Sequence, residues 1–198
     1  MTKLDVINSM LATIGQLPLN ELDARHPHVA SGLRILDQKS ATVQLNAGAG
    51  WWFNILDTFT LRQDIEGKVA VPSDIVKFTP KLYPARYGKV EGYLYDNIND
   101  TDVINANVEV YAIRQLAYED LPVLAQDYIA FSAIRSFQRD YDGDVQKTQD
   151  IKLDEQKAWI ELRAQDIREK RANTKRNPQV ALALSRFSSS HGVLPNAF

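Results

Sequence analysis

The spacing of hydrophobic residues changes twice along this chain of 198 residues, and these changes divide it into three parts. Before residue 50, apolar residues recur every three or four positions, as they do on one face of an α-helix. Between residues 51 and 114 they alternate, as on a half-buried strand. Helical spacing returns at Glu119 and continues to Arg171. This order predicts an α+β fold, in which two N-terminal and two C-terminal helices form an antiparallel bundle with an inserted β-rich domain.

We therefore assign each part of the chain to a predicted domain. Residues 1–50 and 115–172 form the helical bundle, and residues 51–114 form the β-rich insertion. Residues 173–198 form an extended C-terminal arm.

Start and stop signals set the bounds of the two N-terminal helices. Residues 2–14 begin with Thr2 and Asp5, which resemble a capping box, and the glycine that follows ends the helix. A second helix is predicted for residues 28–45, and it ends at a run of alternating alanine and glycine.

The two C-terminal helices are predicted for residues 119–141 and 144–171. Asp120 is a candidate cap for the first of them, and Pro122 suits its first turn. Three apolar residues in the last helix are spaced by seven, which predicts packing against another helix along its length. They are Leu153, Ile160 and Ile167.

Two short aromatic runs stand at the ends of predicted strands. Residues 50–55 read GWWFNI, and residues 92–96 read GYLYD. A strand that starts at Trp51 would place this residue, Phe53 and Phe59 on one face. That alternation favours packing into a core over stacking on bases or sugars. Further strands are predicted at 69–71, 75–78, 90–95 and 108–113, with a turn at 96–100.

Composition offers little catalytic or metal-binding chemistry. The formal net charge is −2 and cysteine is absent, which argues against DNA binding by bulk positive charge and excludes thiolate metal sites. His26 and His28 flank a proline without an acidic or histidine partner at helical spacing, and residues 140–144 do not match a calcium loop. The pair Asp100 and Asp102 is interpreted as part of a solvated turn. We predict no enzyme activity, no cofactor, no metal and no membrane segment.

Basic residues cluster at the end of the last predicted helix. They either contact DNA phosphates or an acidic partner, or they offset the negative end of the helix dipole. The cluster consists of Arg168, Lys170, Arg171, Lys175 and Arg176.

The C-terminal arm mixes turn-forming residues with hydrophobic ones. It either becomes ordered on a partner or forms a short helix over residues 179–187 that docks on the same chain. The predicted partner interface combines the basic cluster with hydrophobic residues of the arm, which are Leu182, Leu184, Phe187, Leu194 and Phe198.

Motifs along the whole chain resemble the tail tubular protein A family of short-tailed phages, the adaptors of the podovirus head-to-tail connector. The resemblance covers residues 2–172 and the last three residues, and it rests on the joint order and spacing of the motifs. Residues 173–190 depart from the family pattern. The matching segments are IGQLP at 14–18, GWWFN at 50–54, VPSD at 71–74, GYLYD at 92–96 with TD at 101–102, LP at 121–122, YI at 128–129, RSFQ at 135–138 and NAF at 196–198.

The resemblance implies a structural virion protein that acts in genome ejection. Family members form a dodecameric ring, an adaptor between the portal and the tail nozzle (tubular protein B), and genome DNA passes through the lumen without sequence-specific binding. The helical part would surround the channel and dock to the portal, with the β part outside. The protein is expected in the virion tail after assembly in the host cytoplasm. Two alternatives are a tail-associated glycan hydrolase and a phage DNA-binding regulator.

Overall fold

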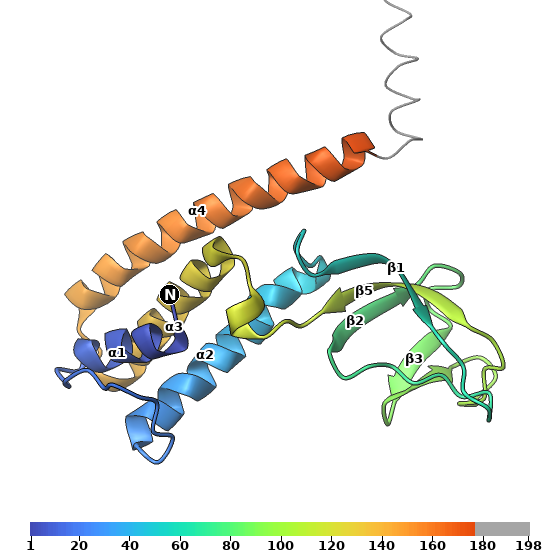
Figure 1. The fold of residues 1–198 in the computed structure, drawn as a ribbon, viewed down its shortest axis with the longest axis horizontal. Coiled ribbons are helices and arrows are strands. Elements are labelled where there is room, and N and C mark those ends of the chain that lie inside the picture. The colour runs from blue at the N-terminus through green and yellow to red at the C-terminus, as the bar shows by residue number, and fades with distance from the viewer. Residues whose placement is uncertain (177–198) are drawn as a thin grey trace, which may run out of the picture.

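The computed structural model describes residues 1–176, with side chains as far as Lys170. Its helices and strands are α1 (Lys3–Thr13), α2 (Pro27–Leu45), β1 (Ile55–Leu61), β2 (Ile75–Pro80), β3 (Tyr87–Val90), β4 (Tyr93–Asp96), β5 (Val108–Arg114), α3 (Val123–Tyr141) and α4 (Val145–Arg176). The helices lie together as one group, here called the helical module, and the strands form a β module beside it (Figure 1). The predicted α+β content is confirmed.

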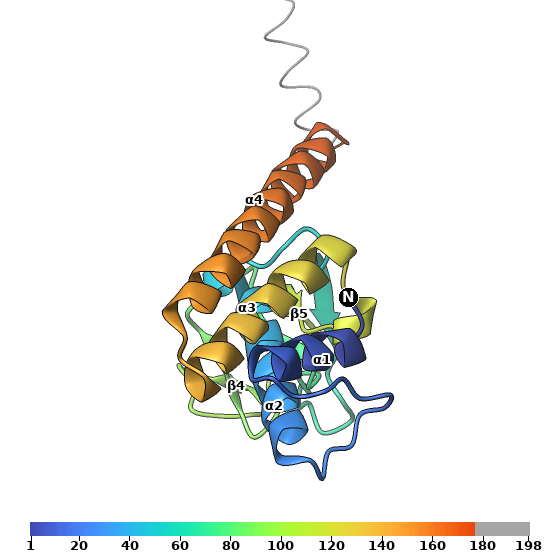
Figure 2. The same ribbon diagram turned by 90° about the vertical axis from the view of Figure 1, so that its left-hand side faces the viewer.

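The helical module has one core, to which α1, α2, α3 and α4 all contribute. Figure 2 shows α1, α2 and α3 side by side, with α4 running along α3 and past the other helices. The predicted capping box of α1 is confirmed, because the Thr2 hydroxyl accepts from the Asp5 N–H at 3.2 Å and the Asp5 carboxylate accepts from the Thr2 N–H at 2.9 Å. Fully buried residues of this core include Ile7, Leu36, Trp51, Ile129, Phe137 and Leu162.

The start of α3 differs from the prediction. Tyr118–Asp120 forms a 3₁₀ turn, Leu121 is extended, and Pro122 stands at the N-cap position. A residue before proline is restricted to extended backbone, so the helix cannot begin earlier. Asp120 therefore does not cap α3, and the predicted start near Glu119 is wrong.

The face of α4 that packs against the module also differs from the prediction. Leu153, Ile160 and Ile167 are 56%, 65% and 43% exposed, while Ala158 and Leu162 are buried. The helix carries apolar residues on two faces, and the sequence pattern selected the one that points outward. The prediction that the row of Leu153, Ile160 and Ile167 packs against another helix is therefore wrong within the described chain, where α4 packs through its other face. The helix also continues to Arg176, five residues beyond the predicted end.

The β module contains an antiparallel sheet in the order β1-β5-β2 and a separate β3–β4 hairpin. An isolated bridge between Ala70 and Tyr93 connects the hairpin to the loop before β2. The predicted strands at 75–78 and 108–113 are confirmed as parts of β2 and β5. Buried residues of the module's core are Leu61, Val69, Val71, Ile75, Leu94, Val108, Val110 and Ala112.

Three predicted strand segments differ from the structure. Residues 51–54 form a turn, so the first strand begins at Ile55. Residues 69–71 make only isolated bridges. The predicted strand at 90–95 is split into β3 and β4, because Glu91 and Gly92 both have positive φ and reverse the chain.

Gly50 gives a first testable prediction, because it joins the two modules with a φ of +61°. A Cβ at this position would lie 2.8 Å from Ile55 Cγ1 and 3.2 Å from Ile113 Cγ1. We expect Gly50→Ala to lower the free energy of unfolding by about 2–3 kcal/mol, through left-handed strain and overpacking together. Urea denaturation measures this change.

The control is Gly15→Ala, because Gly15 has a φ of +74° but no atom within 4 Å of the added Cβ. This variant reports backbone strain alone, which is about 1–2 kcal/mol. If the two variants lost the same free energy of unfolding, the contact of the added Cβ with Ile55 and Ile113 would not contribute to the loss at Gly50.

Candidate interaction surfaces

The first aromatic run forms the junction between the two modules. Trp51 is fully buried in the helical core, where its indole N–H donates to the Val43 carbonyl at the end of α2. Its backbone N–H donates to Asn54 Oδ1 at 2.8 Å, and Asn54 Nδ2 donates to the Gln44 carbonyl at 3.0 Å. The predicted core role of Trp51 is confirmed, although the residue lies in a turn and belongs to the helical module.

Asp166 fastens α4 to this junction. Its buried carboxylate accepts from the Trp52 backbone N–H at 3.1 Å and from Lys170 Nζ at 3.0 Å, and it lies 3.6 Å from the Arg163 guanidinium. Lys170 Nζ also lies 3.4 Å from the Gly50 carbonyl. One member of the predicted basic cluster is thus engaged within the chain.

A second connection joins α2 to the segment that follows β5. The buried Gln44 side chain accepts from the Leu116 N–H at 2.7 Å and donates to the Leu116 carbonyl at 3.0 Å. Its amide also donates to Ser40 at 3.0 Å. Both chain crossings between the modules are therefore held by side-chain hydrogen bonds to backbone groups.

The remaining predicted interface residues have different outcomes. Arg168 is exposed on α4. For Arg171, Lys175 and Arg176 the structure describes the helical backbone but not the side chains. The hydrophobic residues of the arm lie outside the described residues, and they are Leu182, Leu184, Phe187, Leu194 and Phe198.

The second aromatic run organises the β3–β4 hairpin around Asp96. The buried carboxylate accepts from Arg86 Nε at 2.9 Å and Nη2 at 2.6 Å, and from the backbone N–H groups of Ile98 and Asn99 at 3.0 and 3.2 Å. The Arg86 guanidinium, aided by these N–H groups, holds the pKa of Asp96 far below its usual value. The predicted turn at 96–100 is confirmed, and Asp96 is its structural centre.

This lowered pKa predicts how stability depends on pH. The pKa of Asp96 in the folded protein lies below its unfolded value of about 3.9. The ionised carboxylate therefore stabilises the fold above about pH 4, and this contribution is lost as the pH falls below that value. We expect Asp96→Asn to lower Tm by roughly 3 °C at pH 7, and this deficit to shrink as the pH falls below 4. Calorimetry between about pH 2.5 and pH 7 measures the difference in Tm between the variant and the wild type across the titration of Asp96.

Asp57→Asn is the control, because Asp57 is exposed on β1. It should change Tm little at any pH. A deficit of Asp96→Asn that stayed constant from neutral to acid pH would contradict the ionic role of Asp96.

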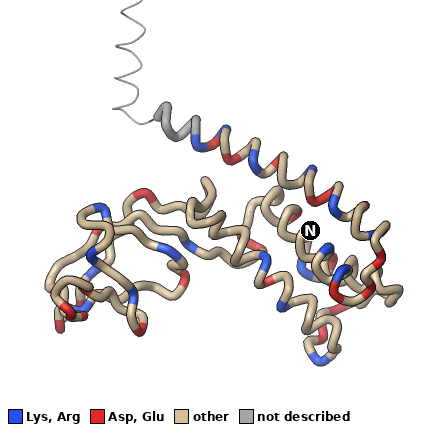
Figure 3. Tube along the Cα trace, turned by 180° about the vertical axis from the view of Figure 1, so that it is seen from behind, with Lys and Arg blue, Asp and Glu red and all other residues tan. Residues whose placement is uncertain are grey.

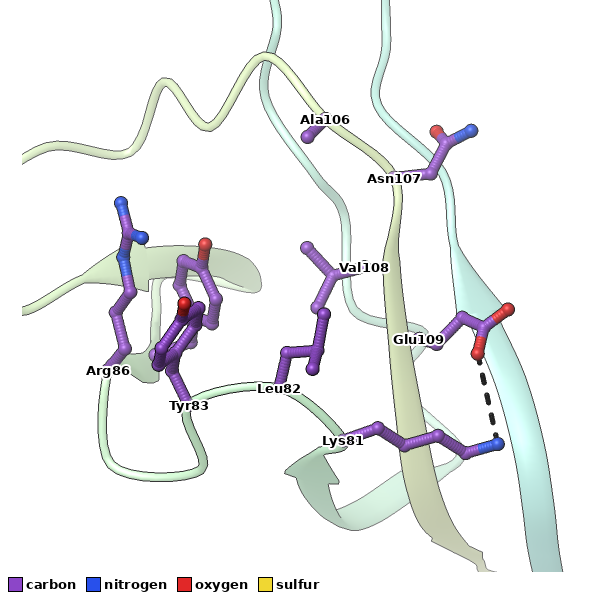
Figure 4. A pocket seen from close by; sticks show the side chains of 9 residues that line it. Lys81, Leu82, Tyr83, Arg86, Ala106, Asn107, Val108 and Glu109 are labelled. Carbon is purple, nitrogen blue, oxygen red and sulfur yellow. Dashed lines mark ion pairs between the residues drawn. The ribbon is translucent and has the colours of Figure 1, made fainter.

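A cavity of about 280 Å³ opens beside this hairpin, between the loop after β2 and the start of β5 (Figure 4). Leu82, Tyr83 and Val108 line it, and Leu82 and Tyr83 are largely exposed. Its charged residues are already paired, since Arg86 binds Asp96 and Lys81 Nζ lies 3.8 Å from the Glu109 carboxylate. The cavity suits contact with an apolar segment better than bond-making chemistry.

Candidate catalytic and metal-binding groups serve local structure. Asp102 pairs with Lys68 at 2.7 Å, and the Tyr95 hydroxyl donates to Asp100 at 2.5 Å. His28 packs edge-on against Tyr141, with ring centroids 5.3 Å apart. Among the described residues, no group of three His, Asp or Glu side chains could hold a metal ion. No helix in the described part is long and apolar enough to cross a membrane.

Comparison with known proteins identifies the family. The model of a family described as tail tubular protein matches residues 4–172, which span both modules. The chain belongs to the tail tubular protein family. Tail tubular protein A of Klebsiella phage KP34 is 25% identical over 148 residues, which are 73% of this chain and 76% of that protein. The resemblance inferred from the motifs is confirmed, and this tail tubular protein is a structural protein of a phage tail.

Proposed function

We propose that this tail tubular protein forms an adaptor ring between the portal and the tail nozzle, tubular protein B. The ring is dodecameric, it assembles in the host cytoplasm, and its lumen is part of the channel through which genome DNA is ejected. The observation that carries this proposal is the family match over residues 4–172, which includes the helices and the β module together. The protein acts as a scaffold and not as an enzyme.

The shape of the subunit supports a ring. Contacts in a closed ring are heterologous, so each subunit must present two different faces. The apolar stripe of α4 (Leu153, Ile160 and Ile167) and the apolar cavity beside Leu82 and Tyr83 lie on different modules. The hydrogen bonds of Gln44 and Asp166 hold these modules to each other, which keeps the two faces at a defined separation.

The charge distribution supports passage of DNA without binding. Over residues 1–170, Lys and Arg alternate with Asp and Glu along both modules (Figure 3). The formal net charge is −2. The affinity of a protein for DNA rises with the number of Lys and Arg residues that contact phosphates. A surface of mixed charge therefore favours weak binding to DNA.

The decisive experiment measures mass in solution, for the full chain alone and mixed with the portal protein of the same phage. We expect a ring, alone or on the portal, by sedimentation velocity and negative-stain imaging, with the portal alone as the control. A monomer that ignores the portal would contradict the proposal. Glycan hydrolysis and salt-dependent DNA binding would then be tested, because these are the activities of the two alternatives.

A further inference from the structure

The cavity of the β module holds large apolar side chains at its edge. Leu82 and Tyr83 are 75% and 68% exposed, although the burial of such side chains stabilises a protein. The buried Val108 lines the same cavity, whose volume is about 280 Å³ (Figure 4). An apolar hollow with exposed apolar residues at its edge is typical of a surface that binds another protein segment.

The backbone of Tyr83 supports this interpretation. Its φ is +55°, in the left-handed region that a bulky side chain rarely adopts. Strain of this kind persists only where the surrounding structure holds it, and it concentrates at ligand clamps and binding sites. Here the Arg86 N–H donates to the Tyr83 carbonyl at 2.9 Å and closes the turn. The turn therefore keeps an aromatic ring at the edge of the cavity in spite of the backbone strain.

The charged residues that line the cavity differ in how fully they are engaged. Arg86 is bound by the buried Asp96 carboxylate, which lies 2.6 Å from Nη2. Lys81 Nζ donates to the Thr58 hydroxyl and lies 3.8 Å from the Glu109 carboxylate. Among the described residues Lys81 is the only ionic partner of Glu109, whose side chain is 60% exposed. The Glu109 carboxylate can therefore accept a cation from another subunit.

The C-terminal arm has the chemistry that this cavity can bind. Within residues 177–198, Arg186 is the only Lys, Arg, Asp or Glu, and Phe187 follows it directly. Residues 171–198 hold no Asp or Glu, and their basic side chains contribute +4 to a formal net charge of −2, which leaves −6 on residues 1–170. Opposite net charges favour a contact between the arm and the rest of a subunit. The basic residues are Arg171, Lys175, Arg176 and Arg186.

The arm begins where α4 has left the packed surface of its own subunit. Figures 1 and 2 show the C-terminal turns of α4 extending beyond the other helices. This helix ends at Arg176, and residues 177–198 follow it. At about 3.3 Å per extended residue they can span roughly 70 Å, whereas a small domain is about 30 Å across. The arm is therefore long enough to reach an adjacent subunit.

We propose that the cavity of the β module binds the C-terminal arm of the neighbouring copy of this chain, with Phe187 in the cavity and Arg186 beside the Glu109 carboxylate. This inference rests on the proposed ring function. The surface that is given, the arm, differs from the surface that receives it, the cavity, so the contact is heterologous. Each copy gives one arm and receives one, and this arrangement closes when the ring closes.

The first test removes the apolar edge of the cavity in the full chain, with Leu82→Ser and Tyr83→Asn together. Asparagine tolerates a left-handed φ better than tyrosine does, so the Tm should stay close to that of the wild type or rise. We expect the concentration for half-assembly, measured by sedimentation velocity with and without the portal, to rise at least about tenfold.

The matched control makes similar changes elsewhere on the β module, at Ile65 and Ile98, which are 104% and 73% exposed. Ile65→Ser with Ile98→Asn should assemble like the wild type. Equal loss of assembly in this control and in the cavity variant would overturn the assignment of the contact to the cavity.

A mixing experiment tests whether the contact joins two copies. The arm variant carries Leu182→Ser, Leu184→Ser and Phe187→Ser, and it should assemble as poorly as the cavity variant. In an equal mixture, arms of the cavity variant can enter the intact cavities of the arm variant, so assembly should recover in part. A mixture that assembles no better than either variant alone would show that the arm does not bind the cavity of another copy.

A charge exchange tests the position of the arm in the cavity. Glu109→Arg should weaken assembly, because Arg186 then meets a cation. Adding Arg186→Glu to the same chain should restore part of the lost assembly, since the two charges are again opposite. Failure of this rescue would overturn the placement of Arg186 beside Glu109.

The outcomes separate this inference from the proposed function. If the cavity variant and the arm variant both form rings as readily as the wild type, the inference is wrong and the ring function stands. If both form rings alone but the arm variant no longer binds the portal, the portal binds the arm and the inference is wrong. If the wild type assembles neither alone nor with the portal, the proposed function fails, and this inference fails with it.

Discussion

Replacing Trp51 with alanine should lower the free energy of unfolding by about 3–5 kcal/mol, the largest loss expected from a single substitution in this protein. The side chain is fully buried, and its indole N–H donates to the Val43 carbonyl. The ring also stacks on Phe53 and meets Trp159 edge-on, with centroids 6.4 and 5.6 Å apart. The variant leaves a cavity where α2, α4 and the junction meet. Guanidinium denaturation followed by circular dichroism measures the loss.

Two variants separate the contributions to this loss. Trp51→Phe keeps most of the apolar volume and removes only the indole donor, because the Val43 carbonyl still accepts from the Asn46 N–H. It should lose about 1–2 kcal/mol, from one hydrogen bond and a small loss of volume. Trp52→Ala changes the neighbouring, only half-buried tryptophan and should lose less than Trp51→Ala. Equal losses for Trp51→Ala and Trp52→Ala would show that burial at the junction does not decide its stability.

Replacing Asp166 with alanine should lower the free energy of unfolding by about 2–3 kcal/mol. The Trp52 N–H loses its acceptor at 3.1 Å, and Arg163 and Lys170 lose the carboxylate that lies between them. The end of α4 should then separate from the junction more often. We expect faster hydrogen exchange in the α4 residues near 166, with exchange in α1 unchanged.

Asp154→Ala is the matched control for Asp166. It removes an exposed carboxylate from the same helix, where Asp154 pairs with Lys157 at 3.3 Å. An exposed pair of this kind contributes only about 0.3–0.5 kcal/mol. If the two alanine variants had the same stability and the same exchange, α4 would not be held to the junction by Asp166.

These two predictions bear on the proposed ring. A ring subunit must hold its contact faces at fixed positions. Trp51 binds the end of α2 and packs against Trp159 of α4, and Asp166 joins α4 to the junction from which the β module extends. Loosening either residue should therefore impair assembly without touching the α4 stripe.

Local chemistry made several elements predictable from the sequence. The capping box of α1 needs only residues three apart, and the helix break at Asp142-Gly143 needs only a glycine that takes a φ of +71°. The strands at 75–78 and 108–113 alternate over enough residues to be recognised. Family membership was also readable, because it depends on the order of short motifs along the chain.

The junction and the cavity were less predictable from the sequence, because the same sequence pattern occurs in more than one structural environment. Alternation of Trp51 and Phe53 suggested a strand, but the left-handed Gly50 and the Asn54 side chain bend the chain into a turn there. Asp166 gave no signal as a buried residue, since its acceptor role depends on Trp52, which is 114 positions away. Cavity residues such as Leu82 and Tyr83 likewise lie together with Val108 only after the β module has folded.

The sequence by itself determined the α+β class, most helix and strand positions, and the tail tubular family, because periodicity, caps and motifs act over a few neighbouring residues. Only the tertiary structure decided which face of α4 is buried. Both Leu162 and the row of Leu153, Ile160 and Ile167 satisfy a helical pattern, and the choice depends on where α3 and the junction offer an apolar surface and a donor for Asp166. Burial is a property of the surrounding surface, and for this reason the exposed row became visible only in the folded chain.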